Sequence, residues 1–464
     1  MTAVLVGAAA LLPACAVFRK LDMAQVHHPS AQRVERNPVI FLHGFLGSKL
    51  ENSQAGGTAW GRVRNLFTRN RRDGLDLPIA GASLDRNRDN LVPYEVCDSV
   101  GGIDYYGPIL RALQEIGGYE PGDIEHPHEG ESLYVLTYDW RRDNVETARQ
   151  LGEAIERIRV AHGRPDLKIN LVAHSMGGLV ARYFIKYGAV DVLGRTEIPA
   201  PSYAGAPYVD KVVLIGTPNE GSMTAFRILN QGVTHALPVE DLFTMPAIYQ
   251  LLPGREARPF IDSDGASLPV SLRDPDNWLK YGWSTFNPET LAKMRRRLPR
   301  AGRDAASFLA LRDQMRLFLD LALERADRFH RALAQTGPGE DQVRFFAFGS
   351  DCIPTQARTV LHRDGESWKL AFTPEDLSRA GQAELPRELF FTPGDGSVTL
   401  ASLLAQEPTS EAALAPGISF ASTVFVCATH GFLPKNPIFQ NNLFHVLSGS
   451  CDPLQQPAGS VAAR

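Results

Sequence analysis

Short runs of apolar residues recur along the chain, and each run ends at Gly, Pro, Asp or His. Continuous apolar runs of about four to eight residues, rich in β-branched and aromatic side chains, are typical of strands buried on both faces of a sheet. The sequence predicts strands of this kind at Val39–Leu42, Leu133–Trp140, Ile169–His174, Lys211–Pro218, Val343–Ser350 and Ser422–Ala428.

Amphipathic helical patterns lie between these runs. Residues 143–162 carry their apolar side chains on one stripe, with Asp143 and Glu146 spaced as a capping box and Gly163 placed to end the helix. Residues 308–333 show the same periodicity. Strands that alternate with amphipathic helices predict an α/β fold with a mostly parallel sheet and right-handed crossovers.

Two segments interrupt this alternation. Residues 51–97 are rich in Gly, Asn and Arg, and residues 221–303 are rich in Pro and Trp with little clean periodicity. Insertions over such a sheet often form lids and substrate walls, although ordinary surface loops fit the first segment nearly as well. The predicted organisation is a core at 34–220 with a lid-like insertion at 51–97, a cap at 221–303 and the rest of the core at 304–450.

The N-terminal residues differ from the rest of the chain. Residues 2–17 are apolar and small, and they are too short for a convincing membrane span, which favours an export signal over a packed apolar helix. The string ending at Cys15 resembles a bacterial lipobox. We therefore expect residues 1–30 to be an export or lipoprotein segment, in a protein exported or membrane-anchored by a bacterium, with a cytoplasmic location as the alternative. Residues 451–464 are expected to form a flexible tail.

Composition narrows the range of functions. The chain has 464 residues, 44% of them hydrophobic, so it can bury a large core. A formal charge of −4 gives no whole-chain positive field and does not indicate nucleic-acid binding. The cysteines beyond Cys15 are even in number, which permits three pairings, and their irregular spacing argues against a zinc site; they are Cys97, Cys352, Cys427 and Cys451.

Ser175 lies between a predicted strand and a predicted helix. A sharp turn at this junction needs small residues two positions before and two after, and Ala173 and Gly177 supply them. This is the pattern of a nucleophile elbow, in which the next amide, that of Met176, helps to bind an oxyanion. A serine that only capped the helix would not need such neighbours. We therefore interpret Ser175 as a nucleophile.

A serine hydroxyl needs a base, and the base needs an orienting acid. His430 follows the last predicted strand, on a loop at its carboxyl edge, from which it can reach Ser175. The other late histidines fall in a helical stripe, a polar segment and a terminal helix: His330, His362 and His445. Asp395 lies between glycines in a tight loop, while Asp351 follows an earlier strand, and chain order alone does not separate these two acids.

A second oxyanion donor is expected where the first predicted strand ends. His43, Gly44 and Phe45 follow that strand, and proteins with an elbow of this kind place a main-chain donor there, so we assign the amide of Phe45. His43 and His174 are interpreted as structural side chains.

Six motifs together resemble the lecithin:cholesterol acyltransferase family, which includes lysosomal phospholipase A2. They are PVIFLHGFLGSKLE, YVLTYDWRR, INLVAHSMGGLVARYF, VVLIGTPNEGS, GDGSVTLASL and ATHGFLPKNPIF, which span Pro38 to Phe439. The resemblance implies an α/β-hydrolase fold and a two-step acyl transfer from a lipid ester to water or an alcohol, without cofactor or metal.

The resemblance also implies site residues. Ser175 and His430 match the family's nucleophile and base, and the resemblance selects Asp395 as the acid, since Asp351 lies in a loop that carries no catalytic group. Phe45 and Met176 match the oxyanion donors.

Two features separate this chain from the animal enzymes of that family. His43 stands where those enzymes have Pro, and the cysteine pair that closes their lid is absent from residues 51–97. Leu46 and Trp60 are the candidate substrate contacts, with a packed surface tryptophan as the alternative for Trp60. Tyr138 to Trp140 is interpreted as sheet-edge structure.

Two questions of function stay open at this level. The basic run Arg62–Arg72 fits either contact with an anionic membrane or a solvated loop. The alternatives to a lipid acyl hydrolase or acyltransferase are a general carboxylesterase or triacylglycerol lipase, and a non-catalytic lipid-binding protein on the same fold. The sequence does not indicate an oligomeric state.

Overall fold

The computed structural model describes residues 36–62, 74–79, 81, 83–100, 103–233, 237–297, 304–406 and 418–448. The predicted export or lipoprotein segment with Cys15, the tail with Cys451, and the basic run beyond Arg62 lie outside these residues.

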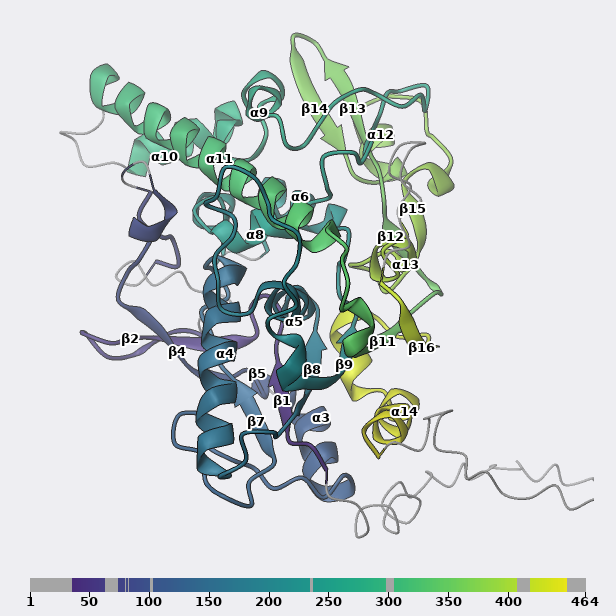
Figure 1. Cartoon of the computed structure of the whole chain (residues 1–464). Coiled ribbons are helices and arrows are strands. Elements are labelled where there is room, and N and C mark those ends of the chain that lie inside the picture. Colours follow the sequence, from purple (N-terminus) through teal and green to yellow (C-terminus); the bar gives the residue numbers. More distant parts are fainter. Residues whose placement is uncertain are drawn as a thin grey trace, which may run out of the picture.

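A parallel sheet forms the centre of the described chain (Figure 1). Its strand order is β16-β11-β9-β8-β1-β7, and every neighbouring pair is parallel. The strands are β1 (Val39–Leu42), β7 (Leu133–Leu136), β8 (Ile169–His174), β9 (Val209–Ile215), β11 (Arg344–Gly349) and β16 (Phe420–Phe425). All six predicted strands are therefore confirmed, with β7, β9 and β16 each ending at least three residues earlier than predicted.

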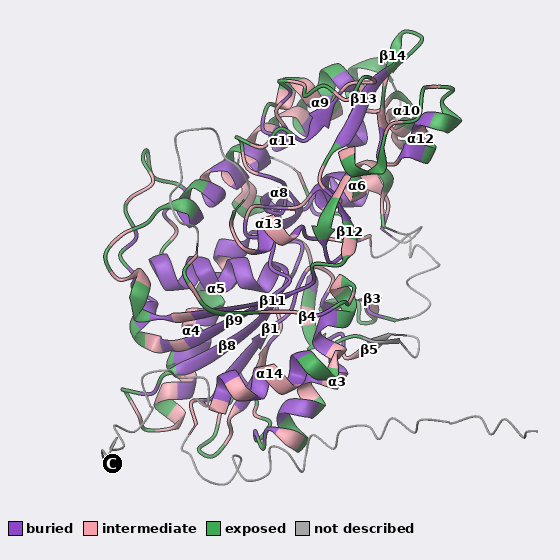
Figure 2. Cartoon of the chain, turned by 90° about the vertical axis from the view of Figure 1, so that its right-hand side faces the viewer, coloured by how far each residue is buried: buried purple, intermediate pink, exposed green. Residues whose placement is uncertain are grey.

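Alternate residues of β1 enter two different cores. Ile40 and Leu42 pack in the cluster formed with α4 (Asn144–Ala161) and α5 (Met176–Tyr187). Val39 and Phe41 pack in the cluster formed with α3 (Gly107–Arg111) and α14 (Pro437–Ser448). Figure 2 shows these helices on opposite faces of the purple, buried sheet. Cover on both faces explains why the strands are continuously apolar.

Helix α4 begins and ends close to the predicted positions. The side chain of Asp143 accepts from the amide of Val145 at 2.8 Å, and Gly163 follows the helix with a φ of 61°. The predicted capping box is wrong in one respect, because the carboxylate of Glu146 accepts instead from the guanidinium of Arg142, at 2.7 Å to Oε1. Charge-assisted bonds to a guanidinium are stronger than a bond to a neutral amide.

A cap lies above the core in Figure 1. It contains α6 (Met223–Gln231), α7 (Val239–Leu242), α8 (Pro246–Gln250), α9 (Pro275–Tyr281) and α10 (Pro288–Arg297). The long helix α11 (Ala305–Ala334) packs on α8 and α5 and so joins the cap to the core.

A small sheet brings residues from the second part of the core into the cap. It contains β10 (Phe260–Ile261), β13 (Thr359–Asp364) and β14 (Ser367–Ala371), and α12 (Pro374–Arg379) follows. His362, interpreted from the sequence as part of a polar segment, is buried in β13, so that interpretation is wrong. The predicted boundaries at 221–303 and 304–450 stay a prediction.

The first insertion forms an antiparallel sheet in its described parts. Its strands are β2 (Ser48–Asn52), β3 (Thr58–Trp60) and β4 (Leu91–Val96), followed by the pair β5 (Ser99–Val100) and β6 (Ile103–Asp104). A second antiparallel pair, β12 (Ile353–Gln356) and β15 (Phe391–Gly394), precedes α13 (Leu400–Leu403). In the described part of the chain, we find no helix with the length and apolar character needed to cross a membrane.

Candidate active site

Ser175 occupies the sharp turn between β8 and α5. Its φ of 55° and ψ of −124° lie in a region that non-glycine residues rarely adopt, at a cost of about 1–3 kcal/mol. Its amide donates to the carbonyl of Ile215 at 2.7 Å, and its side chain makes no capping bond to the helix. A methyl group added to Gly177 would lie 2.6 Å from the carbonyl oxygen of His43, which confirms that the turn needs a small residue there. The backbone is therefore held in a strained form that presents the hydroxyl.

The structure brings Ser175, His430 and Asp395 together. His430 Nε2 lies 2.9 Å from Ser175 Oγ, and His430 Nδ1 lies 2.7 Å from Asp395 Oδ2. The other oxygen of Asp395 accepts from the amides of Ser397 at 2.9 Å and Val398 at 2.7 Å. The three predicted side chains therefore form one hydrogen-bonded chain.

The carboxyl group of Asp395 is buried but ionised. Burial acts to raise its pKa, yet the charge and hydrogen bond of His430 and the two backbone amides outweigh burial and hold the pKa below its usual value. Asp351, the competing acid, is exposed. Asp395 is thus the acid that meets His430.

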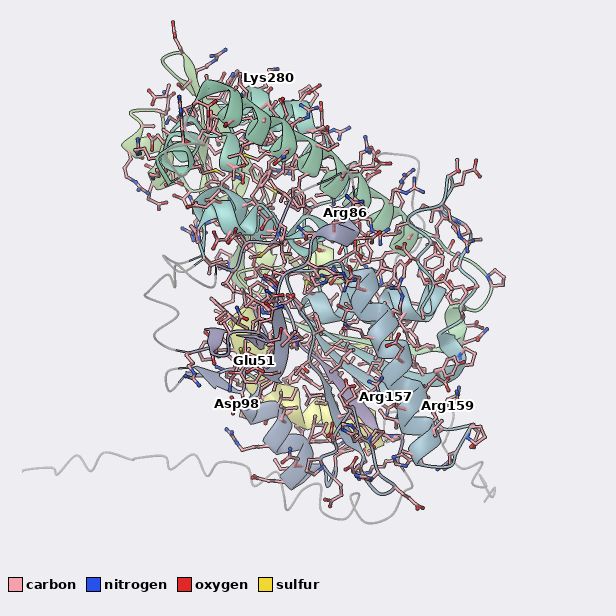
Figure 3. All side chains as sticks on the ribbon, turned by 90° about the vertical axis from the view of Figure 1, so that its left-hand side faces the viewer. Glu51, Arg86, Asp98, Arg157, Arg159 and Lys280 are labelled. Atoms are coloured by element: carbon pink, nitrogen blue, oxygen red, sulfur yellow. A yellow bond between two sulfur atoms is a disulfide. The ribbon has the colours of Figure 1, made fainter. Side chains whose placement is uncertain are left out.

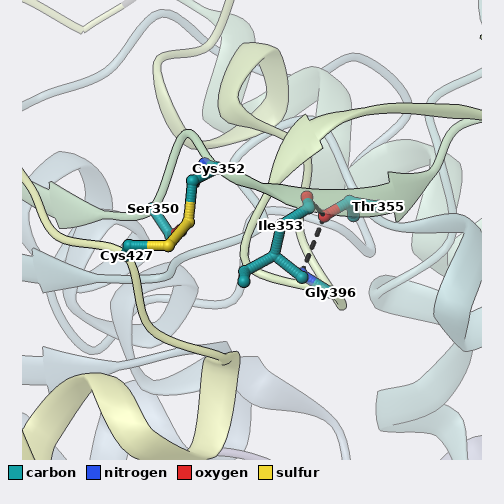
Figure 4. The surroundings of a disulfide bond; sticks show 6 residues. All are labelled: Ser350, Cys352, Ile353, Thr355, Gly396 and Cys427. Atoms are coloured by element: carbon teal, nitrogen blue, oxygen red, sulfur yellow. Dashed lines mark hydrogen bonds between the residues drawn. A yellow bond between two sulfur atoms is a disulfide. The ribbon is translucent and has the colours of Figure 1, made fainter.

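A disulfide ties together the loops that carry Asp395 and His430 (Figure 4). Cys352 is bonded to Cys427, which precedes His430 by three residues. Cys352 leads into β12, which pairs with β15 just before Asp395. Cys97 is a free, buried thiol. The sequence left the cysteine pairing open. In the structure, the bonded pair is the one that joins the loops of the acid and the base.

Thr355 supports the Asp395 loop from the neighbouring strand. Its hydroxyl accepts from the amide of Gly396 at 2.7 Å and donates to the carbonyl of Ile353 at 2.9 Å, as Figure 4 shows for the first bond. Sequence reasoning missed this residue, because nothing local marks a threonine that holds a loop about forty positions away.

The turn after β1 packs directly against Ser175. A methyl group added to Gly44 would lie 2.8 Å from Ser175 Cβ and 3.3 Å from its Oγ. The turn is closed by the bond from the Gly47 amide to the Gly44 carbonyl at 3.1 Å. The ring of Phe45 packs edge-on against Trp140, with ring centres 4.9 Å apart. Phe45 follows Gly44 on this turn, and Met176 follows Ser175 as the first residue of α5, so each is next in the chain to a residue of this contact.

His43 is buried beneath this turn. Its ring stacks on Tyr138 with centres 3.9 Å apart, and Nδ1 lies 2.8 Å from the Gly44 carbonyl. Burial lowers the pKa of His43 to about 4, so the ring is neutral. The hydroxyl of Tyr138 donates to the His43 carbonyl, and Trp140 Nε1 donates to the carbonyl of Ser48 at 3.0 Å. Tyr138 and Trp140, interpreted as sheet-edge structure, thus bond to the residues on either side of the turn.

Tyr106 links this turn to His430 through His174. The Gly44 amide donates to the Tyr106 hydroxyl at 3.0 Å, so that hydroxyl is left to donate to His174 Nδ1, 2.9 Å away. This tautomer, assigned from the network, leaves the proton on Nε2, which donates to the His430 carbonyl at 3.2 Å. Burial, followed by the charge of His430, lowers the pKa of His174 to about 3. Sequence reasoning missed Tyr106, because its partners lie on distant segments.

Ser175 and His430 line a cavity of about 1240 Å³ between core and cap. Trp60 is 5% exposed and donates from Nε1 to the carbonyl of Leu46 at 3.2 Å, so it belongs to the cavity wall and is not a surface side chain. The cap contributes apolar walls from Ala225, Ile228, Val239 and Leu251, and polar groups from Asn230, Gln231, Glu240, Glu289 and Lys293. Among the described residues, no cluster of His, Cys, Asp and Glu has the arrangement of a metal site.

Comparison with known proteins shows that part of the chain is similar to a known family. The family model for lecithin:cholesterol acyltransferase matches residues 112–264, which include Ser175. Lysosomal phospholipase A and acyltransferase of Canis lupus familiaris is 25% identical over 269 residues, covering 50% of this chain and 58% of that protein. The chain is thus similar to the lecithin:cholesterol acyltransferase family over the segment that contains the serine turn.

Other matches to this chain differ in extent. Lecithin-cholesterol acyltransferase-like 4 of Arabidopsis thaliana is 30% identical over 132 residues, covering 27% of this chain and 23% of that protein. The chain thus spans less than two thirds of the length of these relatives. A chain from the crystal structure of the Tle4–Tli4 complex superposes with a TM-score of 0.52 at 15% identity, covering 90% of this chain and 98% of that one. This likeness confirms the predicted α/β-hydrolase fold.

Proposed function

We propose that this protein is a member of the lecithin:cholesterol acyltransferase family and acts as a serine-dependent lipid acyl hydrolase or acyltransferase. The observation that carries the proposal is the chain of hydrogen bonds from Asp395 through His430 to Ser175, which opens into a large cavity with apolar walls. A relative whose name includes both phospholipase A and acyltransferase supports a lipid ester as the substrate.

In the first step, ionised Asp395 holds the proton on His430 Nδ1, which leaves Nε2 free to accept the proton of Ser175. Ser175 Oγ then attacks the carbonyl carbon of the ester. The amides of Phe45 and Met176 stabilise the oxyanion, and each such donor contributes about 3 kcal/mol to lowering the barrier.

In the second step, His430 protonates the leaving alcohol, and an acyl group stays on Ser175. Water or another alcohol enters, gives its proton to His430 Nε2 and takes the acyl group, and His430 then returns that proton to Ser175 Oγ as the bond to the acyl carbon breaks. The apolar side chains of Leu46 and Trp60 offer a wall for the acyl chain, while the polar residues that the cap contributes to the same cavity suit a head group.

The disulfide supports the proposed export of the protein. Disulfides persist in oxidising compartments and are rare in the cytosol, and Cys352 and Cys427 are joined. Mass analysis of the mature N-terminus tests this part: a lipid on Cys15 is expected, and an unprocessed Met1 contradicts it.

The activity is tested by lipid product analysis. The purified protein is incubated with phosphatidylcholine vesicles, with and without a long-chain alcohol, and fatty acid and acyl alcohol are measured. We expect fatty acid release that Ser175→Ala abolishes and that Thr290→Ala, a change in the same cavity, retains. Turnover of short soluble esters alone would indicate a general carboxylesterase, and binding without turnover would indicate a lipid-binding protein.

A further inference from the structure

The 3₁₀ helix η8 (His430–Lys435) has a buried side and an exposed side. Leu433 and Pro434 are buried, whereas Phe432 is 57% exposed. Because a 3₁₀ helix has about three residues per turn, Phe432 and Lys435 lie on the same side of it. The helix is therefore anchored through one side and presents the other to its surroundings.

The ammonium group of Lys435 lies close to two exposed aromatic rings. Its Nζ lies 4.2 Å from the ring centre of Phe432 and 5.5 Å from that of Tyr105, which is 40% exposed. Ile438, in the first turn of α14, is 63% exposed although the next residue, Phe439, is fully buried. Ile438 follows Lys435 by three residues, and we call Tyr105, Phe432, Lys435 and Ile438 the rim patch.

The rim patch lies at the mouth of the cavity that contains Ser175. Tyr105, His430 and Gly431 all line that cavity, and Phe432 is the next residue. Single exposed apolar side chains need no explanation, but a group of them beside a lysine, at the entrance of a cavity, marks an interaction site.

Resting on the proposed function, we infer that the rim patch docks on a phospholipid surface. Phe432, Tyr105 and Ile438 enter the boundary between head groups and acyl chains, and Lys435 lies along them with its ammonium group toward the lipid phosphates. A lipid can then pass from the surface into the cavity without crossing water.

The charges near the patch favour a zwitterionic surface. Asp98, whose carbonyl accepts from the Tyr105 amide at 2.7 Å, has its carboxylate 3.3 Å from Lys49, and Glu95 lies 2.9 Å from the same ammonium group. The chain as a whole carries a formal charge of −4, so its net charge does not draw it to anionic lipids. Docking is therefore expected to depend on apolar area more than on charge.

Vesicle binding tests the inference without any turnover. The full chain with Ser175→Ala is mixed with phosphatidylcholine vesicles, and the bound fraction is measured by flotation. Adding Phe432→Ser and Ile438→Ser is expected to lower the partition coefficient at least about tenfold. The matched control is Val160→Ser, since Val160 is 78% exposed on α4, the helix that bears the labelled Arg157 and Arg159 in Figure 3, and it lines a separate cavity.

The outcomes separate the inference from the proposed function. Unchanged binding of the Phe432→Ser/Ile438→Ser protein, with a normal unfolding midpoint, overturns the inference. So does binding that requires anionic lipid, or a change from dimer to monomer that shows the patch to be covered by a second copy. Binding that responds to the patch in a protein without lipid turnover would uphold the inference while the proposed function fails.

Discussion

The backbone amide of His430 donates to the carbonyl oxygen of Asp395 at 2.8 Å, so the two residues are joined through the main chain as well as through their side chains. This second bond fixes the loop of the base against the loop of the acid before any substrate arrives. Preorganisation of this kind matters because a misplacement of about 1 Å can cost about a hundredfold in rate.

The acid assignment predicts unequal effects at two aspartates. Asp395→Asn removes the charge that holds the proton on His430 Nδ1, so kcat is expected to fall by about 10³–10⁴, while the unfolding midpoint changes little. Asp351→Asn, at an exposed position, keeps most activity. Steady-state kinetics on a soluble ester measures both, and equal losses at the two positions contradict the assignment.

The disulfide is expected to protect both stability and catalysis. Cys352 and Cys427 are 75 residues apart, and loss of a crosslink of this span costs about 2–4 kcal/mol in the free energy of unfolding. Dithiothreitol should lower the unfolding midpoint and the rate together. Cys352→Ser/Cys427→Ser serves as the control and should show no further response to the reductant. If dithiothreitol still lowers the unfolding midpoint of that double variant, its effect does not come from this disulfide.

Tyr106 is expected to act through the turn that carries Phe45. Tyr106→Phe leaves the buried Gly44 amide without its acceptor and breaks the bond to His174, at a cost of about 1–3 kcal/mol. Because the affected groups hold the oxyanion donor and the base, kcat should fall about tenfold to a hundredfold with KM nearly constant. Tyr105→Phe, which keeps the neighbouring ring, is the control. A change in KM alone would assign Tyr106 to substrate binding.

Buried histidines predict a loss of stability in acid. Burial lowers the pKa of His43 to about 4 and those of His174 and His330 to about 3, from an ordinary value of 6.5. Between these values and 6.5 the unfolded chain binds protons that the folded chain does not. Stability is therefore complete above about pH 6.5 and falls as the pH drops, by up to about 1.4 kcal/mol per pH unit for each histidine.

Chemical unfolding between pH 7 and pH 4 measures this slope. His330→Gln, which can keep the bond to the Gln250 carbonyl, should reduce the slope by about one proton, whereas His128→Asn at an exposed position should not. A slope that is the same in His330→Gln and the parent protein contradicts the assignment.

The sheet could be predicted because its signals are local. Strands such as β1 and β8 are covered on both faces, so every residue in them must be apolar or well paired, and this leaves a continuous run in the sequence. The nucleophile elbow could be predicted for the same reason, because steric crowding at Ser175 restricts the residues close to it in the chain.

The features that the sequence did not predict depend on contacts between residues far apart in the chain. Asp395 meets His430 because β12 pairs with β15 and a disulfide ties β12 to the His430 loop, and none of these pairings leaves a periodic pattern. For the same reason the sequence did not show β13 joining β10, about a hundred residues earlier, in the cap. The family resemblance selected Asp395 where spacing alone did not.

Labelling with a fluorophosphonate, read by intact mass and peptide mapping, tests the central claim most directly. The account predicts a single adduct on Ser175 in the folded protein, little labelling in His430→Ala and none in Ser175→Ala. Folded protein that takes up no label, or label that persists after Ser175→Ala, would contradict it.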